Sequence, residues 1–150
     1  MSITDDRRRE QLGNEIAALM GPLVRGLNSA FQTCAGALGL TPSEAQILWL
    51  LQLRGALPIK DLARALDIDP ANASTLVTKL ERRGLARRDA APHDRRMRLI
   101  ELTGAGRGMR DRLAACIADR KPTFRDLTTD ELVVFRDLLR RLADADRAGR

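Results

Sequence analysis

Two closely spaced helix-start signals constrain the fold of this chain more than any other feature. Thr41-Pro42-Ser43-Glu44 combines a capping threonine, a proline suited to the first helical position and a glutamate that can close a capping box. Asp69-Pro70 repeats the cap and the proline, while Gly55 and Gly84 are typical helix ends. Short helices are therefore predicted over 42–54, 59–66 and 70–83, the last two joined by a tight turn.

A short hairpin is predicted directly after the third of these helices. Residues 85–88 and 97–102 favour extended backbone, and apolar and polar side chains alternate in the second segment. The intervening residues 89–94 have turn chemistry, including a proline. We expect a β-hairpin with arginines at its tip.

Amphipathic helices are predicted on both sides of this region. Over 7–36, apolar residues recur at spacings of three and four. Gly21-Pro22 interrupts the stripe, and because an interior proline removes a backbone hydrogen bond, we expect a bend or two helices there. Two more helices should follow, one after Thr103 and one after the capping box that begins at Thr128.

The predicted fold class is mainly α with a small β-hairpin wing, that is, a winged helix-turn-helix with N- and C-terminal dimerisation helices. The predicted domains are 1–37 for dimerisation, 38–103 for the winged unit and 104–150 for the C-terminal dimerisation helices. A winged unit does not need further amphipathic helices to fold. Their apolar stripes therefore favour a homodimer.

The positive charge is concentrated in one segment. Residues 79–112 hold eleven basic and five acidic side chains. This segment therefore carries a charge of +6, which equals the net charge of the whole chain. A field focused in this way attracts a polyanion. The simpler alternative is a solvated arginine-rich face. Aromatic residues make up only 3% of the chain, which argues against the stacking platforms that bind single-stranded nucleic acid.

Several other classes of protein find no support in the sequence. No apolar run approaches the ~18 residues of a membrane span, and the N-terminus lacks the apolar core of a signal peptide. Cys34 and Cys116 make no disulfide framework, so we expect a cytoplasmic protein without a membrane partner. The single histidine, His93, has no partner pattern, and nucleophile and metal motifs are absent from the sequence. We expect no catalytic residue, no metal and no cofactor.

The outer face of helix 70–83 is polar and has the shape that enters the major groove of double-stranded DNA. Asparagine and lysine can bind base edges, while hydroxyls reach bases or phosphates. The candidate recognition residues are Asn72, Ser74, Thr75, Thr78, Lys79 and Arg82. An ordinary amphipathic surface helix has the same pattern, but the basic hairpin that follows favours DNA binding, since tip arginines can enter the minor groove. The candidate hairpin residues are Arg88, Asp94, Arg95, Arg96 and Arg98.

Residues Leu40 to Gly106 resemble the MarR family of bacterial transcription regulators. The similar stretches are LTPSEAQILWLL, PIKDLARALDI, LVTKLERRGLARR and HDRRMRLIELTGAG. The last resembles the family's wing, an Asp-x-Arg followed by a strand that ends in Leu-Thr-x-x-Gly. The resemblance implies that Arg96 enters the minor groove and that Asp94 orients the wing through an ion pair. Its partner is either Arg95 or an arginine within 82–88. We expect Arg95 and Arg98 to contact phosphates.

The resemblance also implies a homodimer on a palindromic operator and repression relieved by a small molecule, often an aromatic acid or phenol, bound between the terminal helices and the winged unit. The candidate pocket residues are Arg25, Phe31, Trp49 and Arg112. Gly21-Pro22 departs from the family's uninterrupted first helix. One alternative is a regulator that senses oxidants through Cys34. A second alternative is a winged-helix adaptor or non-specific DNA-binding protein, although an adaptor would expose apolar residues where this chain has polar ones.

Overall fold

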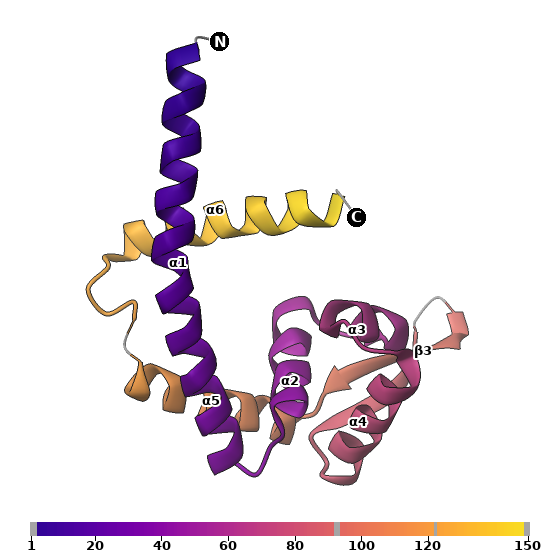
Figure 1. Ribbon diagram of the computed structural model, residues 1–150. Helices are drawn as coiled ribbons and strands as arrows, with labels where there is room; N and C mark the ends of the chain where they lie inside the picture. Colours follow the sequence, from indigo (N-terminus) through magenta and orange to yellow (C-terminus); the bar gives the residue numbers. More distant parts are fainter. Residues whose placement is uncertain (1–2, 92–93, 122, 149–150) are drawn as a thin grey trace.

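The computed structural model describes residues 3–91, 94–121 and 123–148 (Figure 1). The predicted order of four helices, a hairpin and two helices is confirmed, with one short strand added. The elements are α1 (Ile3–Ala37), α2 (Pro42–Arg54), β1 (Leu57–Pro58), α3 (Ile59–Leu66), α4 (Pro70–Arg82), β2 (Ala86–Ala91), β3 (Asp94–Leu102), α5 (Gly104–Arg120) and α6 (Thr129–Ala148).

The helix starts are the ones that the sequence predicts. The Thr41 hydroxyl accepts a hydrogen bond from the backbone N–H of Glu44, whose carboxylate accepts from the N–H of Thr41, so the capping box is complete. The Asp69 carboxylate accepts from the N–H of Asn72 at 2.9 Å, and the Thr103 hydroxyl accepts from the N–H of Gly106 at 3.0 Å. Local capping chemistry therefore sets where α2, α4 and α5 begin.

The strands form a small antiparallel sheet in the order β1-β3-β2. β1 was not predicted, because its two residues include Pro58, and proline normally argues against a strand. It is tolerated here because β1 lies at the edge of the sheet, where Leu57 pairs with Ile100 and Pro58 with Leu99.

The hairpin is longer than predicted. Residues 89–91 and 94–96 belong to strands rather than to a turn, because the ladder between β2 and β3 extends past the turn-forming residues. The register then changes from the pair Ala90–Arg98 to the pair Ala91–Asp94. The ladder therefore has an irregularity of the β-bulge type between Ala90 and Ala91.

Helix α1 is continuous, so the alternative of two helices is wrong. Pro22 lies inside the helix. In Figure 1 the axis of α1 changes direction about half-way along its length, as expected for a helix with an interior proline. The departure from an uninterrupted first helix is therefore a bend at most.

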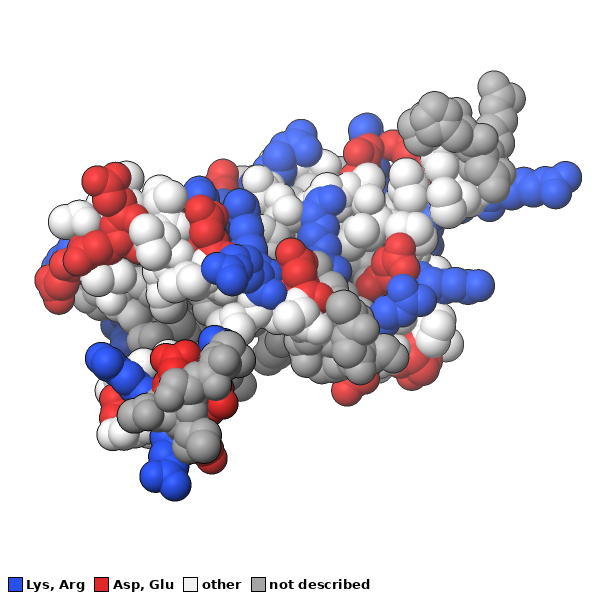
Figure 2. All heavy atoms as spheres, turned by 90° about the horizontal axis from the view of Figure 1, so that it is seen from above, with Lys and Arg blue, Asp and Glu red and all other residues white. Residues whose placement is uncertain are grey.

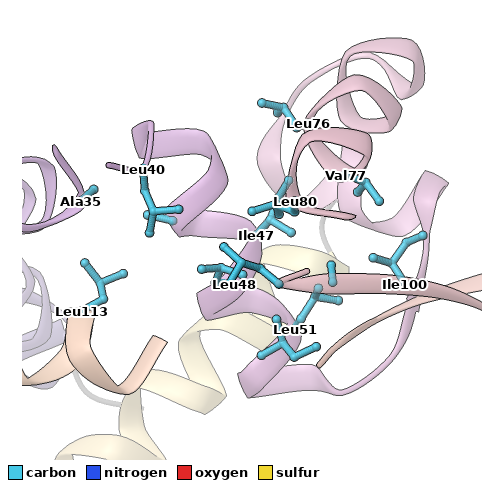
Figure 3. Close-up of a cluster of buried hydrophobic side chains, with 14 of the residues drawn as sticks. Ala35, Leu40, Ile47, Leu48, Leu51, Leu76, Val77, Leu80, Ile100 and Leu113 are labelled. Atoms are coloured by element: carbon cyan, nitrogen blue, oxygen red, sulfur yellow. The ribbon is translucent and has the colours of Figure 1, made fainter. Parts of the chain in front are cut away.

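One hydrophobic core joins the winged unit to the terminal helices (Figure 3). Side chains of α2, including Ile47 and Leu48, lie at its centre, facing α4 and β3 on one side. On the other side it includes Leu113 of α5 and Ala35 at the end of α1. The apolar face predicted for α4 is confirmed, since the helix buries Ala73, Leu76, Val77 and Leu80. Helix α4 is thus supported by the same core that holds α1 and α5.

A disulfide bond links Cys34 of α1 to Cys116 of α5, with their Cα atoms 5.9 Å apart. Sequence analysis did not predict this bond. The two residues are separated by 82 positions, and only the packing of α1 against α5 brings them together. The bond encloses the whole winged unit in one covalent loop.

The N-terminal half of α1 and all of α6 extend away from the core (Figure 1). Both helices expose large apolar side chains. On α1 these are Leu12, Ile16, Leu19, Met20 and Val24, and on α6 they are Val133, Val134, Leu138, Leu139 and Leu142. Among the described residues, no helix has the combination of length and apolar character needed to cross a membrane.

Candidate nucleic-acid interface and ligand cavity

Helices α3 and α4 form a helix pair joined by a turn in which Asp67 adopts left-handed backbone angles, with φ of 54°. The buried face of α4 points into the core, which leaves Asn72, Thr75, Lys79 and Arg82 exposed. Their spacing of three, four and three residues places these four side chains along one stripe of the helix. We call this set the outer stripe. It is the part of the helix that can reach a groove of DNA.

The remaining two candidates on α4 lie on a different side. Ser74 and Thr78 are half-buried, and the Thr78 hydroxyl donates a hydrogen bond to the Ser74 carbonyl at 2.9 Å. Both face Arg88 of β2. Nη2 of Arg88 donates to the Ser74 carbonyl and hydroxyl, each at 3.1 Å, and to the Thr78 hydroxyl at 3.3 Å. Nη1 of Arg88 lies 2.7 Å from a carboxylate oxygen of Glu81. The structure thus brings Ser74, Thr78 and Arg88 together in a half-buried cluster between α4 and β2.

The candidate hairpin residues lie on β3 apart from Arg88. Arg96 and Arg98 are exposed, and Arg96 falls in the bulge of the strand. The side chains of Asp94 and Arg95 and the whole of His93 lie outside the described residues, so the ion pair expected for Asp94 stays a prediction. Three of the alternative partners within 82–88 already have other acidic neighbours. Arg83 lies near Glu44, Arg87 pairs with Glu101 and Asp89, and Arg88 pairs with Glu81.

Ion pairs within the fold reduce the number of arginines that contribute to the positive field. The hydrogen bond to Glu101, helped by the charge of Asp89, raises the pKa of the exposed Arg87 guanidinium. Arg83 at the end of α4 donates to the Gly39 carbonyl at 2.9 Å and lies 3.7 Å from the buried carboxylate of Glu44. Figure 2 shows mixed charges over one face of the molecule, with basic side chains projecting furthest at the end where the hairpin lies in Figure 1.

Two of the four candidate pocket residues meet. The rings of Phe31 and Trp49 pack edge to face with their centroids 6.2 Å apart. They line a cavity of about 420 Å³ between α1, α2 and α5, and a second cavity of about 390 Å³ between α1, α2 and α3. Arg25 and Arg112 are exposed and line neither cavity.

The basic residues near this aromatic pair were not predicted. The guanidinium carbon of Arg110 lies 5.1 Å from the centroid of the Trp49 ring, and Lys121 lines the larger cavity. Lys121 crosses α1 at Gly26, where a Cβ atom would come within 2.9 Å of its Cε. Helical phase could have identified Arg110, because Arg110 is three residues before the buried Leu113, whereas Arg112 projects to another side.

The helix pair with a basic hairpin beside its second helix defines the class of winged helix-turn-helix proteins. Residues 38–97 match the model of the MarR family. The HTH-type transcriptional regulator FarR of Neisseria gonorrhoeae is 25% identical over 123 residues, which cover 81% of this chain and 84% of that protein.

Solved structures of the same kind also match. A MarR-family transcriptional regulator from Silicibacter pomeroyi superposes with a TM-score of 0.67 and 26% identity, covering 83% of this chain and 84% of that one. CouR from Rhodococcus jostii RHA1, bound to p-coumaroyl-CoA, has a TM-score of 0.68 and 27% identity over 88% of this chain and 94% of its own. Residues 38–97 belong to the MarR family, and the chain has the fold of that family's winged helix-turn-helix transcriptional regulators.

Proposed function

We propose that this regulator binds a palindromic operator as a homodimer, acts as a repressor in the cytoplasm, and reads base edges through the outer stripe of α4. The observation that carries the proposal is the exposure of Asn72, Thr75, Lys79 and Arg82 along one line of a helix whose opposite face is buried. Arg96 and Arg98 on the hairpin supply contacts to the adjacent minor groove and phosphates.

The homodimer is supported by the apolar surfaces of α1 and α6. Leu19 is 74% exposed and Leu142 is 62% exposed, and contiguous apolar faces of this kind mark association surfaces. A two-fold dimer would place its α4 helices about 34–36 Å apart, one turn of DNA. We expect wild-type protein at micromolar concentration to have twice the mass of one chain by light scattering.

A matched pair of leucines tests the location of this interface. Leu19→Asp should give monomers, because it buries a charge in the proposed interface. Leu53→Asp is the control, since Leu53 is 69% exposed on α2, outside the terminal helices, and should leave the dimer intact. A monomeric wild type, or equal effects of the two substitutions, would contradict the proposal.

We further propose that a small aromatic acid or its thioester binds in the larger cavity and changes DNA affinity. The cavity volume of about 420 Å³ falls in the range of small-molecule sites, and Lys121 offers a cation at an otherwise largely apolar wall. CouR, the similar protein named above, was solved with p-coumaroyl-CoA. A carboxylate or another anionic group would bind Lys121 while the ring packs on Phe31 and Trp49.

Trp49 is the single tryptophan of the chain, so its fluorescence reports on this cavity directly. Titration with p-coumarate and with p-coumaroyl-CoA should change the emission. Lys121→Met should weaken the response at least about tenfold, the value of one charged hydrogen bond. Arg112→Met is the control with an equal loss of charge outside the cavity. An unchanged response in Lys121→Met, or the same loss in Arg112→Met, would contradict the proposal.

Redox sensing is a second candidate function, favoured by the disulfide between Cys34 and Cys116. Disulfides in cytosolic proteins are usually transient and redox-sensing. In such a step the two thiols would reduce one molecule of peroxide to two of water, losing two protons and two electrons as the S–S bond forms. Reduced and peroxide-treated protein should then differ in a DNA gel-shift assay, while Cys34→Ser should not respond. Identical shifts of the wild type under both conditions would contradict this function.

A further inference from the structure

Arg88 is the one candidate hairpin residue that lies on β2, and its guanidinium is directed at α4 rather than at solvent. It makes three hydrogen bonds to Ser74 and Thr78 and an ion pair with Glu81. The side chains of Arg88 and Glu81 are 31% and 27% exposed. We call Arg88 with these three residues of α4 the Arg88 cluster.

The Arg88 cluster lies between the core face and the outer stripe of α4. Ser74, Thr78 and Glu81 are spaced by four and three residues, so they share one line of the helix. Apolar packing of the opposite face is non-directional and tolerates a small rotation or shift of the helix. Hydrogen bonds require both distance and angle, so the fork of Arg88 restricts these movements.

The charge of Arg88 argues against a direct role on DNA. Its guanidinium lies 2.7 Å from the Glu81 carboxylate, and the pair together contributes little to the positive field. A phosphate would have to compete with Glu81 and with three hydrogen bonds already made. Arg98, in contrast, is exposed on β3, opposite Ala90 of β2.

We propose that Arg88 is a positioning residue for sequence recognition, which sets the rotation of α4 against the hairpin and thereby directs Asn72 and Lys79 at base edges without touching DNA itself. This inference rests on the proposed function, in which the outer stripe of α4 reads the operator. Arg88 therefore affects which sequence is bound more than how strongly DNA in general is bound.

The test uses the full chain and two DNA probes of about 30 base pairs, long enough for two half-sites one turn apart. One duplex is selected by the wild-type protein from a random library, and the other is a scrambled version of the same composition. Arg88→Lys keeps the charge but loses the planar fork. We expect affinity for the selected duplex to fall about tenfold, or about 1.4 kcal/mol. Affinity for the scrambled duplex should stay within about twofold, and the salt dependence should not change.

Two further variants separate positioning from direct contact. Arg98→Met should weaken binding to both duplexes and reduce the slope of log affinity against log salt by about 0.9 per lost phosphate contact. Thr78→Val removes one acceptor of Arg88 with little change in shape. It should reduce selectivity in the wild type but add nothing to Arg88→Lys, because the two substitutions break the same contact. If Arg88→Lys does not melt cooperatively, Thr78→Val alone is used for the test.

Three results would overturn the inference: full selectivity of Arg88→Lys, a reduced salt slope like that of Arg98→Met, or additive effects of Arg88→Lys and Thr78→Val. The proposed function fails separately. If Asn72→Ala changes the base preference while Arg88→Lys leaves it unchanged, only the positioning role is wrong. If the wild type selects no sequence, both are wrong.

Discussion

Gly106 in the first turn of α5 allows this helix to lie close to the backbone of Leu85. A Cβ atom at this position would lie 1.9 Å from the Leu85 carbonyl oxygen and 2.9 Å from its carbonyl carbon. Both distances are below 3.0 Å, a limit that real Cβ atoms essentially never cross. The carbonyl cannot easily move, because it accepts a hydrogen bond from the N–H of Thr103 at 3.2 Å.

Gly106→Ala should therefore destabilise the protein even though alanine favours helix formation by about 1 kcal/mol over glycine. Relieving the overlap requires α5 to move by roughly an ångström from the junction of α4 and β2. Overpacking of this kind costs about 1–3 kcal/mol, and the contact here is with backbone, so we expect about 3 kcal/mol. That corresponds to a fall in Tm of about 6–12 °C for a chain of this size.

The matched control is Gly108→Ala in the same helix. A Cβ atom on Gly108 would meet nothing within 4 Å, so only the gain in helix propensity remains. Thermal unfolding followed by circular dichroism should place Gly108→Ala at or slightly above the wild type and Gly106→Ala well below it. If Gly106→Ala melts at the same temperature as Gly108→Ala, the close approach of α5 to Leu85 is not as described.

Three other predictions concern stability. Reduction of the Cys34–Cys116 disulfide should lower the free energy of unfolding by about 4–5 kcal/mol in the chain-entropy model, because the bond closes a loop of 82 residues. Thermal unfolding with and without reductant checks this, and equal melting temperatures would contradict it. Leu113→Ala should cost about 2–5 kcal/mol in denaturant unfolding, since this side chain is fully buried; a cost below about 1 kcal/mol would place it outside the core. The backbone N–H of Thr128 donates a hydrogen bond to the Glu131 carboxylate and lowers the pKa of Glu131 from its ordinary value of 4.5. This hydrogen bond should therefore stabilise the start of α6 above pH 4.5, and the stabilisation should be lost as the pH falls through the lowered pKa. An NMR titration of the Glu131 carboxyl carbon with a midpoint at or above 4.5 would refute the last prediction.

Sequence reasoning succeeded where the structure depends on local chemistry. The caps at Thr41, Asp69 and Thr103 determine helix starts through residues three positions apart, and these are visible in the sequence. The apolar face of α4 follows from helical periodicity alone, and with it the position of the outer stripe. The part of the candidate site that lies opposite a buried face could therefore be predicted.

Features that depend on distant partners could not be predicted in this way. β1 contains only two residues and exists because β3 pairs with it. Arg88 donates a hydrogen bond to Ser74, which lies 14 positions earlier in the sequence. The local sequence around Arg88 therefore did not show whether this arginine holds α4 or binds DNA. The disulfide requires α1 and α5 to pack together first. These contacts depend on the tertiary fold, and local sequence patterns do not predict which distant segments pack together.

If the outer stripe of α4 chooses the DNA sequence, Asn72→Ala should change which base pairs the protein prefers. Affinities of the wild type and Asn72→Ala should be measured against a set of duplexes in which each base pair of the selected operator is changed in turn. The base preference should relax by about 1–3 kcal/mol at one position in each half-site, while binding to scrambled DNA should be unchanged. A uniform loss of affinity across all duplexes, with the base preferences intact, would contradict it.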